Sequence, residues 1–372
     1  MRWCQRCVLP DTRPNLVIGA DGVCNACKNH GTKKVIDWEA RERLWQQVVA
    51  NAKHRSTGYD CLIPVSGGKD STWQVVKCLE YGLNPLAFTW KTPARTALGR
   101  RNLENLVSLG VDHMDYQVNP KVEKRFLRES LARYGSTAIP MHMAIFNMPL
   151  TLAVRYAIPL IVWGENSAFE YGGSEEESTG FKLDRAWMQK FGVTHGTTAQ
   201  DWVQFGFDRK AMLPYFGPAP EELAARDVLA VFLGYYFPWD VEISLKTACE
   251  HGFQVRVDGP KTGYYNYADI DDDFISIHHF LKWYKFGFTR LFDNLSLEIR
   301  HGRMTRERAI DIIKQQGAEP PHDDIALFCA FVGMTQDQFF QVIEPFRNLA
   351  IWHVDQGVWK IRDFLMEDWN WK

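Results

Sequence analysis

A short glycine-rich stretch, Ser66-Gly-Gly-Lys-Asp-Ser71, carries residue types suited to binding and activating a phosphate group. It follows an apolar run, Cys61 to Val65, that predicts a buried strand, and it leads into apolar residues at helical spacing from Ser71 to Tyr81. Paired glycines let backbone N–H groups approach an anion, and the N-terminus of the following helix adds unsatisfied donors and a positive dipole. The stretch therefore predicts a phosphate-binding loop.

Two better-known phosphate motifs do not fit this stretch. A Walker A loop would need glycine at position 63, where the chain has Ile63, and the G-x-G-x-x-G spacing is absent as well. Ser-Gly-Gly-Lys-Asp-Ser after a strand resembles the PP-loop of the ATP pyrophosphatase superfamily, whose members cleave ATP between the α- and β-phosphates. The alternative interpretation is an ordinary strand-to-helix turn.

Four cysteines at the start of the chain form two C-x-x-C pairs, Cys4 with Cys7 and Cys24 with Cys27, separated by 16 residues. This spacing is typical of a four-thiolate zinc site, which is closed and therefore structural. Disulfides, a redox-active pair and an iron–sulfur cluster are the alternatives. The remaining cysteines stand singly in apolar surroundings and are predicted to be buried: Cys61, Cys78, Cys249 and Cys329.

Composition describes an ordinary globular protein with a formal net charge of −2, which argues against a dedicated nucleic-acid-binding protein. The sequence contains no run of 18 apolar residues, and Met1 leads into no signal-peptide segment. We therefore expect a cytoplasmic protein without membrane insertion.

Beyond the loop, predicted strands alternate with predicted helices, which indicates an α/β fold with a doubly wound parallel sheet. The expected strands are 61–65, 85–90, 111–118 and 159–163, and the expected helices are 37–53, 71–81, 97–109, 121–134 and 141–157. Ligands of such sheets bind where the strands end. One rim should therefore gather Ser66 to Ser71, Thr89-Trp90-Lys91 and Gly164-Glu165-Asn166.

Other polar stretches are weaker candidates. Glu175 to Glu177 has the character of a solvated charge run, whereas Thr262 to Asp273, with three tyrosines and four aspartates, is equally consistent with an acidic loop and a binding segment. Residues 194–220 predict an elaborated loop, and Val228 to Pro238 is apolar. Helices are expected from Ser244 onward, and Ile351 to Ile361 predicts a terminal hairpin. We expect a zinc ribbon over 1–36, an ATP-binding domain over 37–240 and a mainly helical region over 241–372.

Taken together, the cysteine pairs, the Ser66–Ser71 loop, Gly164-Glu-Asn166 and the segments Tyr284–Gly287 and Glu298–Gly302 resemble the N-acetyl sugar amidotransferases of bacterial surface-polysaccharide and nonulosonic-acid biosynthesis. The resemblance extends over nearly the whole chain. It implies ATP-dependent conversion of a sugar N-acetyl group to an acetamidino group, with ATP and Mg²⁺ as cofactors beside a structural Zn²⁺. The substrate would be a UDP-linked N-acetylated sugar.

The resemblance also implies roles for individual residues. Ser66, Gly67, Gly68 and Ser71 would hold the pyrophosphate of ATP, Lys69 would neutralise phosphate charge, and Asp70 would hold Mg²⁺. Phe88, Thr89 and Trp90 would contact adenine. Glu165 and Asn166 would orient substrate or metal, and Asp271 to Asp273 are weaker candidates for the same site.

The expected ammonia source lies in a partner protein. None of the four single cysteines stands in the G-x-C-x-G context of a class I glutaminase, and Arg2 occupies the place where an N-terminal-nucleophile glutaminase has cysteine. A separate glutaminase with a synthase-like subunit should therefore supply ammonia. Two other functions remain open: a PP-loop tRNA-modifying enzyme of the thiolase type, and a non-catalytic zinc-ribbon protein that binds nucleotide.

Overall fold

A five-stranded parallel sheet organises the molecule. The computed structural model describes residues 1–166, 169–170, 172–173, 180, 182–183, 187–188, 190 and 192–371. The strand order is β3-β2-β1-β4-β5, and the strands are β1 (Cys61–Pro64), β2 (Pro85–Trp90), β3 (Asp112–Tyr116), β4 (Leu160–Trp163) and β5 (Leu229–Phe232). The inner strands are almost wholly apolar because helices cover both faces of the sheet. The predicted doubly wound α/β fold is confirmed.

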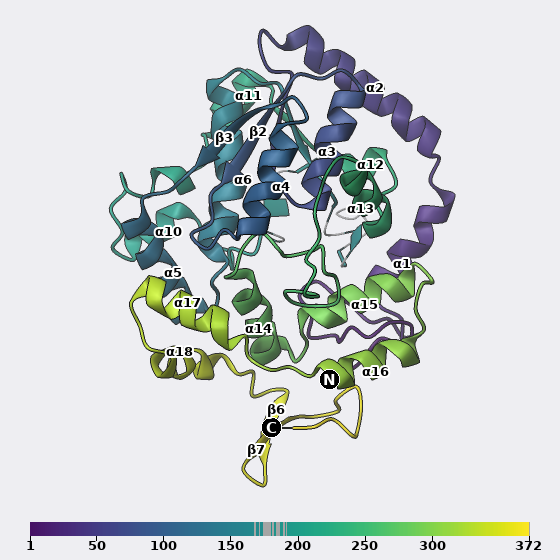
Figure 1. The fold of residues 1–372 in the computed structure, drawn as a ribbon, viewed down its shortest axis with the longest axis vertical. Coiled ribbons are helices and arrows are strands. Elements are labelled where there is room, and N and C mark those ends of the chain that lie inside the picture. Colours follow the sequence, from purple (N-terminus) through teal and green to yellow (C-terminus); the bar gives the residue numbers. More distant parts are fainter. Residues whose placement is uncertain are drawn as a thin grey trace.

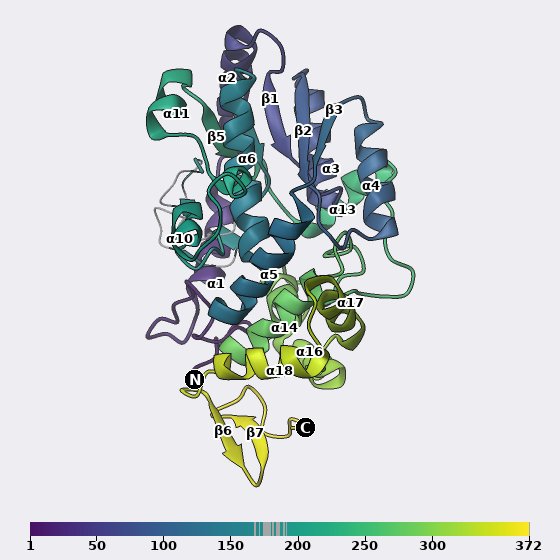
Figure 2. The ribbon, with the colours of Figure 1, turned by 90° about the vertical axis from the view of Figure 1, so that its left-hand side faces the viewer.

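Side chains of the central strand alternate between two cores, because successive residues of a strand point to opposite faces. Cys61 and Ile63 pack with α2 (Trp38–Arg55), α3 (Lys69–Glu80), α4 (Ala97–Val107), α12 (Leu233–Tyr236) and α13 (Val241–Glu250). Leu62 packs on the other face, with α5 (Pro120–Tyr134), α6 (Ile139–Arg155), α10 (Ala199–Gln204) and η2 (Leu213–Tyr215). Figure 2 shows α6 on one side of the sheet and α4 on the other.

The C-terminal region is helical and lies beyond the carboxyl ends of the strands (Figure 1). It comprises α14 (Ile275–Phe286), α15 (Arg290–Arg300), α16 (Arg306–Gln316), α17 (His322–Val332), α18 (Gln336–Ile343) and η3 (Glu344–Phe346). A hairpin of β6 (Trp352–Asp355) and β7 (Val358–Ile361) follows, as predicted. The four N-terminal cysteines, the last of them in α1 (Asn25–Thr32), share one hydrophobic core with these helices, and η1 (Lys33–Val35) follows α1.

Three expectations about elements and burial are wrong. The apolar stretch from Val228 contains an edge strand, β5, and then α12, so the sheet has one strand more than the sequence predicted. Because the second half of this run forms a helix, the four-residue strand has no distinct periodicity in the sequence. The apolar spacing of the helix expected over 37–53 predicts Trp38, Leu44, Val48 and Val49 on its buried side. The buried residues of α2 are instead Trp45, Val49 and Ala52, whereas Leu44 is 43% exposed. Cys249 is exposed near the end of α13.

Residues 194–220 are elaborated as expected, and they contain α10 and η2 and lead into α11 (Pro220–Arg226). In the part of the chain that the structure describes, no single helix is long and apolar enough to cross a membrane. Among the described residues, one pair of helices, α5 and α6, is long and apolar enough when the two are taken together, but it is bent by 120° at the joint.

Candidate active site

The predicted phosphate-binding loop, Ser66 to Ser71, joins the central strand β1 to α3. Gly67 adopts φ +88°, and a Cβ there would lie 2.8 Å from the backbone nitrogen of Leu103, so the position requires glycine. The N–H of Ser66 donates to Ser71 Oγ at 3.0 Å, and the N–H of Gly68 donates to Ser66 Oγ at 3.3 Å. No side chain caps α3 at Gly68, which leaves backbone donors at the helix N-terminus for an anion.

Lys69 and Asp70, the first residues of α3, form a tight ion pair at this loop. Lys69 Nζ lies 2.7 Å from both carboxylate oxygens of Asp70, and it also donates to Ser244 Oγ of α13 at 3.1 Å. The indole N–H of Trp239 donates to Asp70 Oδ1 at 3.0 Å. Lys69 is only 4% exposed, so its charge is held in place by these partners.

Glu165, which follows β4, lines the same cavity of about 190 Å³ as Lys69 and Asp70. Burial, and secondarily the Asp70 carboxylate, raise the pKa of Glu165 to about 7. Two carboxylates in a partly desolvated cavity are ligands that suit Mg²⁺. Glu165 and Asp70, which the sequence predicts for one site, therefore do line the same cavity.

Asn166 has a different position. It is 7% exposed, its amide donates to the carbonyl of Gly180 at 3.3 Å, and the indole of Trp187 donates to its Oδ1 at 3.3 Å. Asn166 does not line the cavity and instead ties together the segment after β4. The predicted rim residue Lys91 points to Gln117, at 3.3 Å, and the Glu175–Glu177 run lies outside the described residues.

A second cavity, of about 230 Å³, opens on the other side of the loop. Its walls include Phe88, Thr89 and Trp90 from β2 and Trp163 from β4, and it shares Ser66, Ser71 and Asp271 with the first cavity. The indole N–H groups of Trp90 and Trp163 have no acceptor among the described residues. Aromatic walls fit a purine base, which is flat.

The segment from Gly263 to Asp273 crosses from the C-terminal region to the loop. The N–H of Thr96 donates to the carbonyl of Asp271 at 3.1 Å, and the N–H of Asp273 donates to the carbonyl of Ala94 at 3.0 Å. A Cβ at Gly99 would lie 2.6 Å from Asp271 Cα, so the two backbones touch at this point. Burial raises the pKa of Asp271 to about 6, although the hydroxyl of Ser66 lowers it.

Several residues of the first cavity were not identified from the sequence. They are Trp239, Tyr265, Tyr267, Arg290 and Asn294. Lone aromatic and polar side chains far along the chain carry no spacing signal. The tyrosine-rich composition of residues 262–273 is the one sequence feature that points to this cavity, and it is equally consistent with an acidic loop.

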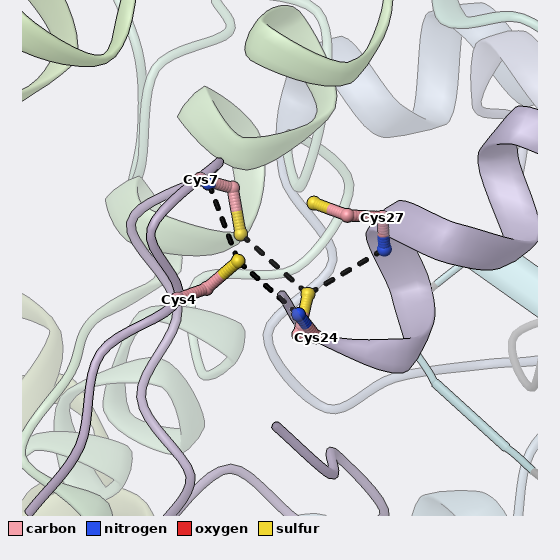
Figure 3. Close-up of side chains that lie close together, drawn as sticks. All are labelled: Cys4, Cys7, Cys24 and Cys27. Atoms are coloured by element: carbon pink, nitrogen blue, oxygen red, sulfur yellow. Dashed lines mark hydrogen bonds between the residues drawn. The ribbon is translucent and has the colours of Figure 1, made fainter. Parts of the chain in front are cut away.

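The four N-terminal cysteines form a second site, distant in sequence from the loop (Figure 3). Their Sγ atoms lie within 4.8 Å of one another, and all four side chains are buried. The Sγ atoms of Cys7 and Cys24 are 3.8 Å apart, and a tetrahedral zinc site with Zn–S bonds of about 2.3 Å has sulfur–sulfur edges of about 3.8 Å. None of the four is disulfide-bonded, and the space between them suits one ion rather than a cluster of several irons. The residues fit a structural zinc ion.

Residues close to the cysteine cluster also contact Glu170 and Gly173, which follow β4. Lys33 Nζ lies 2.7 Å from Glu170 Oε1 and donates to the carbonyl of Trp239 at 3.1 Å. Arg300, buried close to the cysteine cluster, donates to the carbonyl of Glu170 at 3.1 Å. Asn25 donates to the carbonyl of Gly173 at 3.2 Å. Glu170 and Gly173, which follow Glu165 in sequence, are therefore held by residues 25–33 and by α15.

Comparison with known proteins adds information for the C-terminal region. Residues 261–366 match the family model described as "LPS biosynthesis protein WbpG-like, C-terminal domain". This match confirms, for that region, the resemblance to proteins of bacterial surface-polysaccharide biosynthesis. No curated protein matches the chain.

Two solved structures overlap with parts of the fold. A predicted subunit of tRNA methyltransferase from Methanocaldococcus jannaschii is 16% identical, covers 64% of this chain and 91% of its own, and superposes with a TM-score of 0.32. NMN synthetase from Francisella tularensis is 12% identical, covers 52% and 92%, and gives a TM-score of 0.27. Such distant likenesses carry no functional argument. The chain thus combines an α/β domain, a glycine-rich loop at Ser66 to Ser71 that resembles a PP-loop, four clustered cysteines and a region similar to the C-terminal domain of WbpG-like lipopolysaccharide biosynthesis proteins.

Proposed function

We propose that this protein is an ATP-dependent amidotransferase that converts the N-acetyl group of a nucleotide-linked sugar into an acetamidino group. The observation that carries the proposal is the pair of cavities joined at Ser66, Ser71 and Asp271, in a chain whose C-terminal region matches a lipopolysaccharide biosynthesis family. One cavity fits a purine base, and the other gathers Lys69, Asp70 and Glu165. A nucleotide lying across the loop would bring its phosphates to these groups.

The reaction must make an amide reactive, because an amide carbonyl is a poor electrophile and its oxygen a poor leaving group. Transfer of AMP from ATP to that oxygen releases pyrophosphate and forms an O-adenylyl imidate. Ammonia then adds to the imidate carbon, AMP leaves with the former amide oxygen, and the acetamidino group remains. The cavity beside Lys69 is where the N-acetyl group would meet the α-phosphate.

Different residues of the two cavities would contribute to this reaction. Backbone N–H groups of Gly67 and Gly68 and the start of α3 would bind the departing pyrophosphate. Lys69 is positioned to offset negative charge on the phosphates. Asp70 and Glu165 would hold Mg²⁺, which supplies charge that screens the triphosphate. Phe88 and Trp90 would flank the adenine.

Ammonia would come from a partner glutaminase with a synthase-like subunit, as the absence of glutaminase motifs in the sequence predicts. At neutral pH most free ammonia is ammonium, which is not nucleophilic. Delivery from a partner would raise turnover without changing the chemistry. At high pH, added ammonium salts should replace the partner.

The test is AMP release by the purified protein. It is incubated with ATP, Mg²⁺ and ammonium chloride at alkaline pH together with a panel of UDP-linked N-acetylated sugars, and AMP and product mass are measured. We expect sugar-dependent AMP and a product in which NH replaces one oxygen. AMP release that depends on unmodified tRNA and not on a sugar would contradict the proposal, and so would nucleotide binding without turnover under any of these conditions.

A further inference from the structure

One face of α15 lines the cavity beside Lys69. Arg290, Asn294 and Leu297 stand four and three residues apart, so they lie on the same side of the helix, and all three border this cavity. They belong to the region 261–366, which is similar to the C-terminal domain of WbpG-like proteins. The same region contributes six more lining residues, all from one segment: Tyr265, Tyr267, Ala268, Asp269, Ile270 and Asp271. The predicted phosphate-binding loop and the WbpG-like region therefore border one cavity together.

The side chain of Asn294 is fixed in orientation but keeps an unused donor. Asn294 is 1% exposed, and its Oδ1 accepts a hydrogen bond from the N–H of Tyr264 at 3.0 Å. A Cβ at Gly263, which has φ +74°, would lie 2.2 Å from the same Oδ1, so the turn before Tyr264 packs directly on the amide. The amide Nδ2 has no acceptor among the residues that the structure describes. Because an unpaired buried donor is costly, an acceptor on a ligand in this cavity would bind to it favourably.

The surroundings of Asn294 suit a neutral group that carries both an oxygen and a methyl. Arg290 Nε already lies 3.0 Å from Asp269 Oδ2, so this part of the cavity brings no uncompensated cation. The apolar side chain of Leu297 lies one helical turn from Asn294 on the same face. The hydroxyl of Tyr265 donates to the backbone carbonyl of Asn294 at 3.3 Å, and its ring stacks on that of Tyr267 with centroids 4.8 Å apart. An acetamido group has the matching parts, a carbonyl oxygen and a methyl group.

We propose that Asn294 determines specificity for the acetamido group of the sugar substrate, by donating a hydrogen bond from Nδ2 to its oxygen, while Leu297 and the two tyrosines contact its methyl group. The inference rests on the proposed function, since it names the residues that recognise the group to be converted. A carbonyl oxygen has two lone pairs. One would accept from Asn294, and the other would stay available for the α-phosphorus of an ATP whose phosphates lie at Ser66 to Ser71. Asn294 would thereby orient the reacting oxygen without exchanging a proton.

The experiment measures binding to the full chain by calorimetry, with α,β-methylene-ATP present to occupy the phosphate-binding loop. UDP-N-acetylglucosamine is compared with UDP-glucose, and UDP-N-acetylgalactosamine with UDP-galactose, because each pair differs only by an acetamido group in place of a hydroxyl. Asn294→Asp keeps an oxygen for the N–H of Tyr264 but adds a charge, whereas Asn294→Leu is neutral but loses that oxygen. The lost donor is the change common to both variants. Asn119→Asp is the matched control, since exposed Asn119 likewise accepts from a backbone N–H, that of Lys121 at 3.0 Å, and lines neither cavity.

In the wild type we expect the acetamido sugar of at least one pair to bind about tenfold more tightly than its hydroxyl counterpart, the effect of one good hydrogen bond. Both Asn294 variants, verified as folded by thermal unfolding, should lose this preference, and Asn119→Asp should keep it. Equal affinities within both pairs for the wild type, or a preference that survives in a folded Asn294 variant, would overturn the inference. Loss of α,β-methylene-ATP binding in Asn294→Leu with the sugar preference intact would overturn it too, by assigning the donor to the nucleotide. If the preference depends on Asn294 but no sugar yields an acetamidino product, the acetamido site stands and the proposed reaction fails.

Discussion

Gly67 shows how one residue without a side chain supports the proposed nucleotide site. Its left-handed backbone and its approach to Leu103 both exclude a Cβ. We predict that Gly67→Ala lowers the free energy of unfolding by roughly 2 kcal/mol or more, from the positive φ and the steric clash together. It should also abolish measurable binding of α,β-methylene-ATP, because the N–H groups of the loop would move.

Gly58 provides the control for that variant. It precedes β1, and a Cβ there would meet no atom within 4 Å. Gly58→Ala should unfold in urea near the wild-type midpoint and bind the ATP analogue normally. Normal analogue binding by Gly67→Ala would mean that the loop does not hold the phosphates.

Glu123 of α5 is buried, at 2% exposed, and its Oε1 has no hydrogen-bond partner among the described residues. Burial, and then the carboxylate of Asp272, raise the pKa of Glu123 to about 8. The folded state therefore holds a proton that the unfolded state releases near pH 4.5, so this group's contribution to stability is fully present at acid pH and is lost as pH rises through about 8.

We predict that Glu123→Gln is more stable than wild type at pH 8.5, by a few kcal/mol at most, and that the difference shrinks toward pH 5. Thermal unfolding across this pH range is the measurement. Glu129→Gln, on the same helix but paired with Arg133 at the surface, should show no such trend. If the stability of the wild type rises relative to that of Glu123→Gln between pH 5 and 8.5, the pKa of Glu123 is not raised in the folded state.

At the scale of elements, the sequence predicted best where one local rule decided the outcome. The apolar runs of β1, β2 and β4 are bounded by turn residues, and the side chains of Asp37 and Thr305 cap the starts of α2 and α16. β5 was missed because it is four residues long and continues directly into α12. The inward side of α2 was misjudged because tertiary packing selects Trp45, which the apolar pattern of Leu44 and Val48 did not favour.

The segment after β4 depends on a neighbouring element, η1, for its position. Lys33 contacts both Glu170 and the carbonyl of Trp239, whose indole N–H in turn donates to Asp70. We predict that Lys33→Met lowers kcat for sugar-dependent AMP release by about tenfold, since Glu165 and Asp70 would be held less rigidly. Affinity for α,β-methylene-ATP should change less than kcat.

A loss of kcat in Lys33→Met could come from lower protein stability or from poorer positioning of Glu165 and Asp70, so the two effects must be measured separately. Lys33→Met removes the one ion-pair partner that the buried Glu170 carboxylate has among the described residues, at a cost of roughly 3–5 kcal/mol. The double variant Lys33→Met, Glu170→Gln should recover most of the stability but not kcat. Lys28→Met, on α1 and half exposed, is the control. Full kcat in a folded double variant would show that this ion pair does not position the site.

On the scale of the whole molecule, the candidate site is assembled from parts of the chain that lie far apart in sequence. The loop at Ser66, the residue Trp239 and the segment around Asp271 all border one cavity. Local patterns predicted the loop, because strand, glycines and helix are adjacent in sequence. They could not predict that Arg290 or Tyr265 would arrive beside it, since that depends on how the C-terminal helices pack across the ends of the strands.

The cysteine cluster joins the two ends of the chain in one core. All four cysteines pack with residues of α14 to α18 and with the terminal hairpin, and this core contains Trp283, Trp352 and Trp369. Structural zinc contributes folding free energy directly, on the order of 10 kcal/mol in small zinc modules. Removing it should therefore destabilise the ribbon and the C-terminal helices together, whereas the two cores of the sheet contain no cysteine of the cluster.

We predict that the protein as purified contains one zinc per chain by mass spectrometry, and that a strong chelator or Cys24→Ser red-shifts tryptophan emission and lowers the Tm markedly. Cys249→Ser, at an exposed single cysteine, should leave both unchanged. Since Lys33 and Arg300 link this core to the segment that carries Glu165, zinc loss should also weaken Mg²⁺-dependent binding of α,β-methylene-ATP. A chelated protein with unaltered emission, Tm and nucleotide binding would show that the cluster holds no ion that the fold requires.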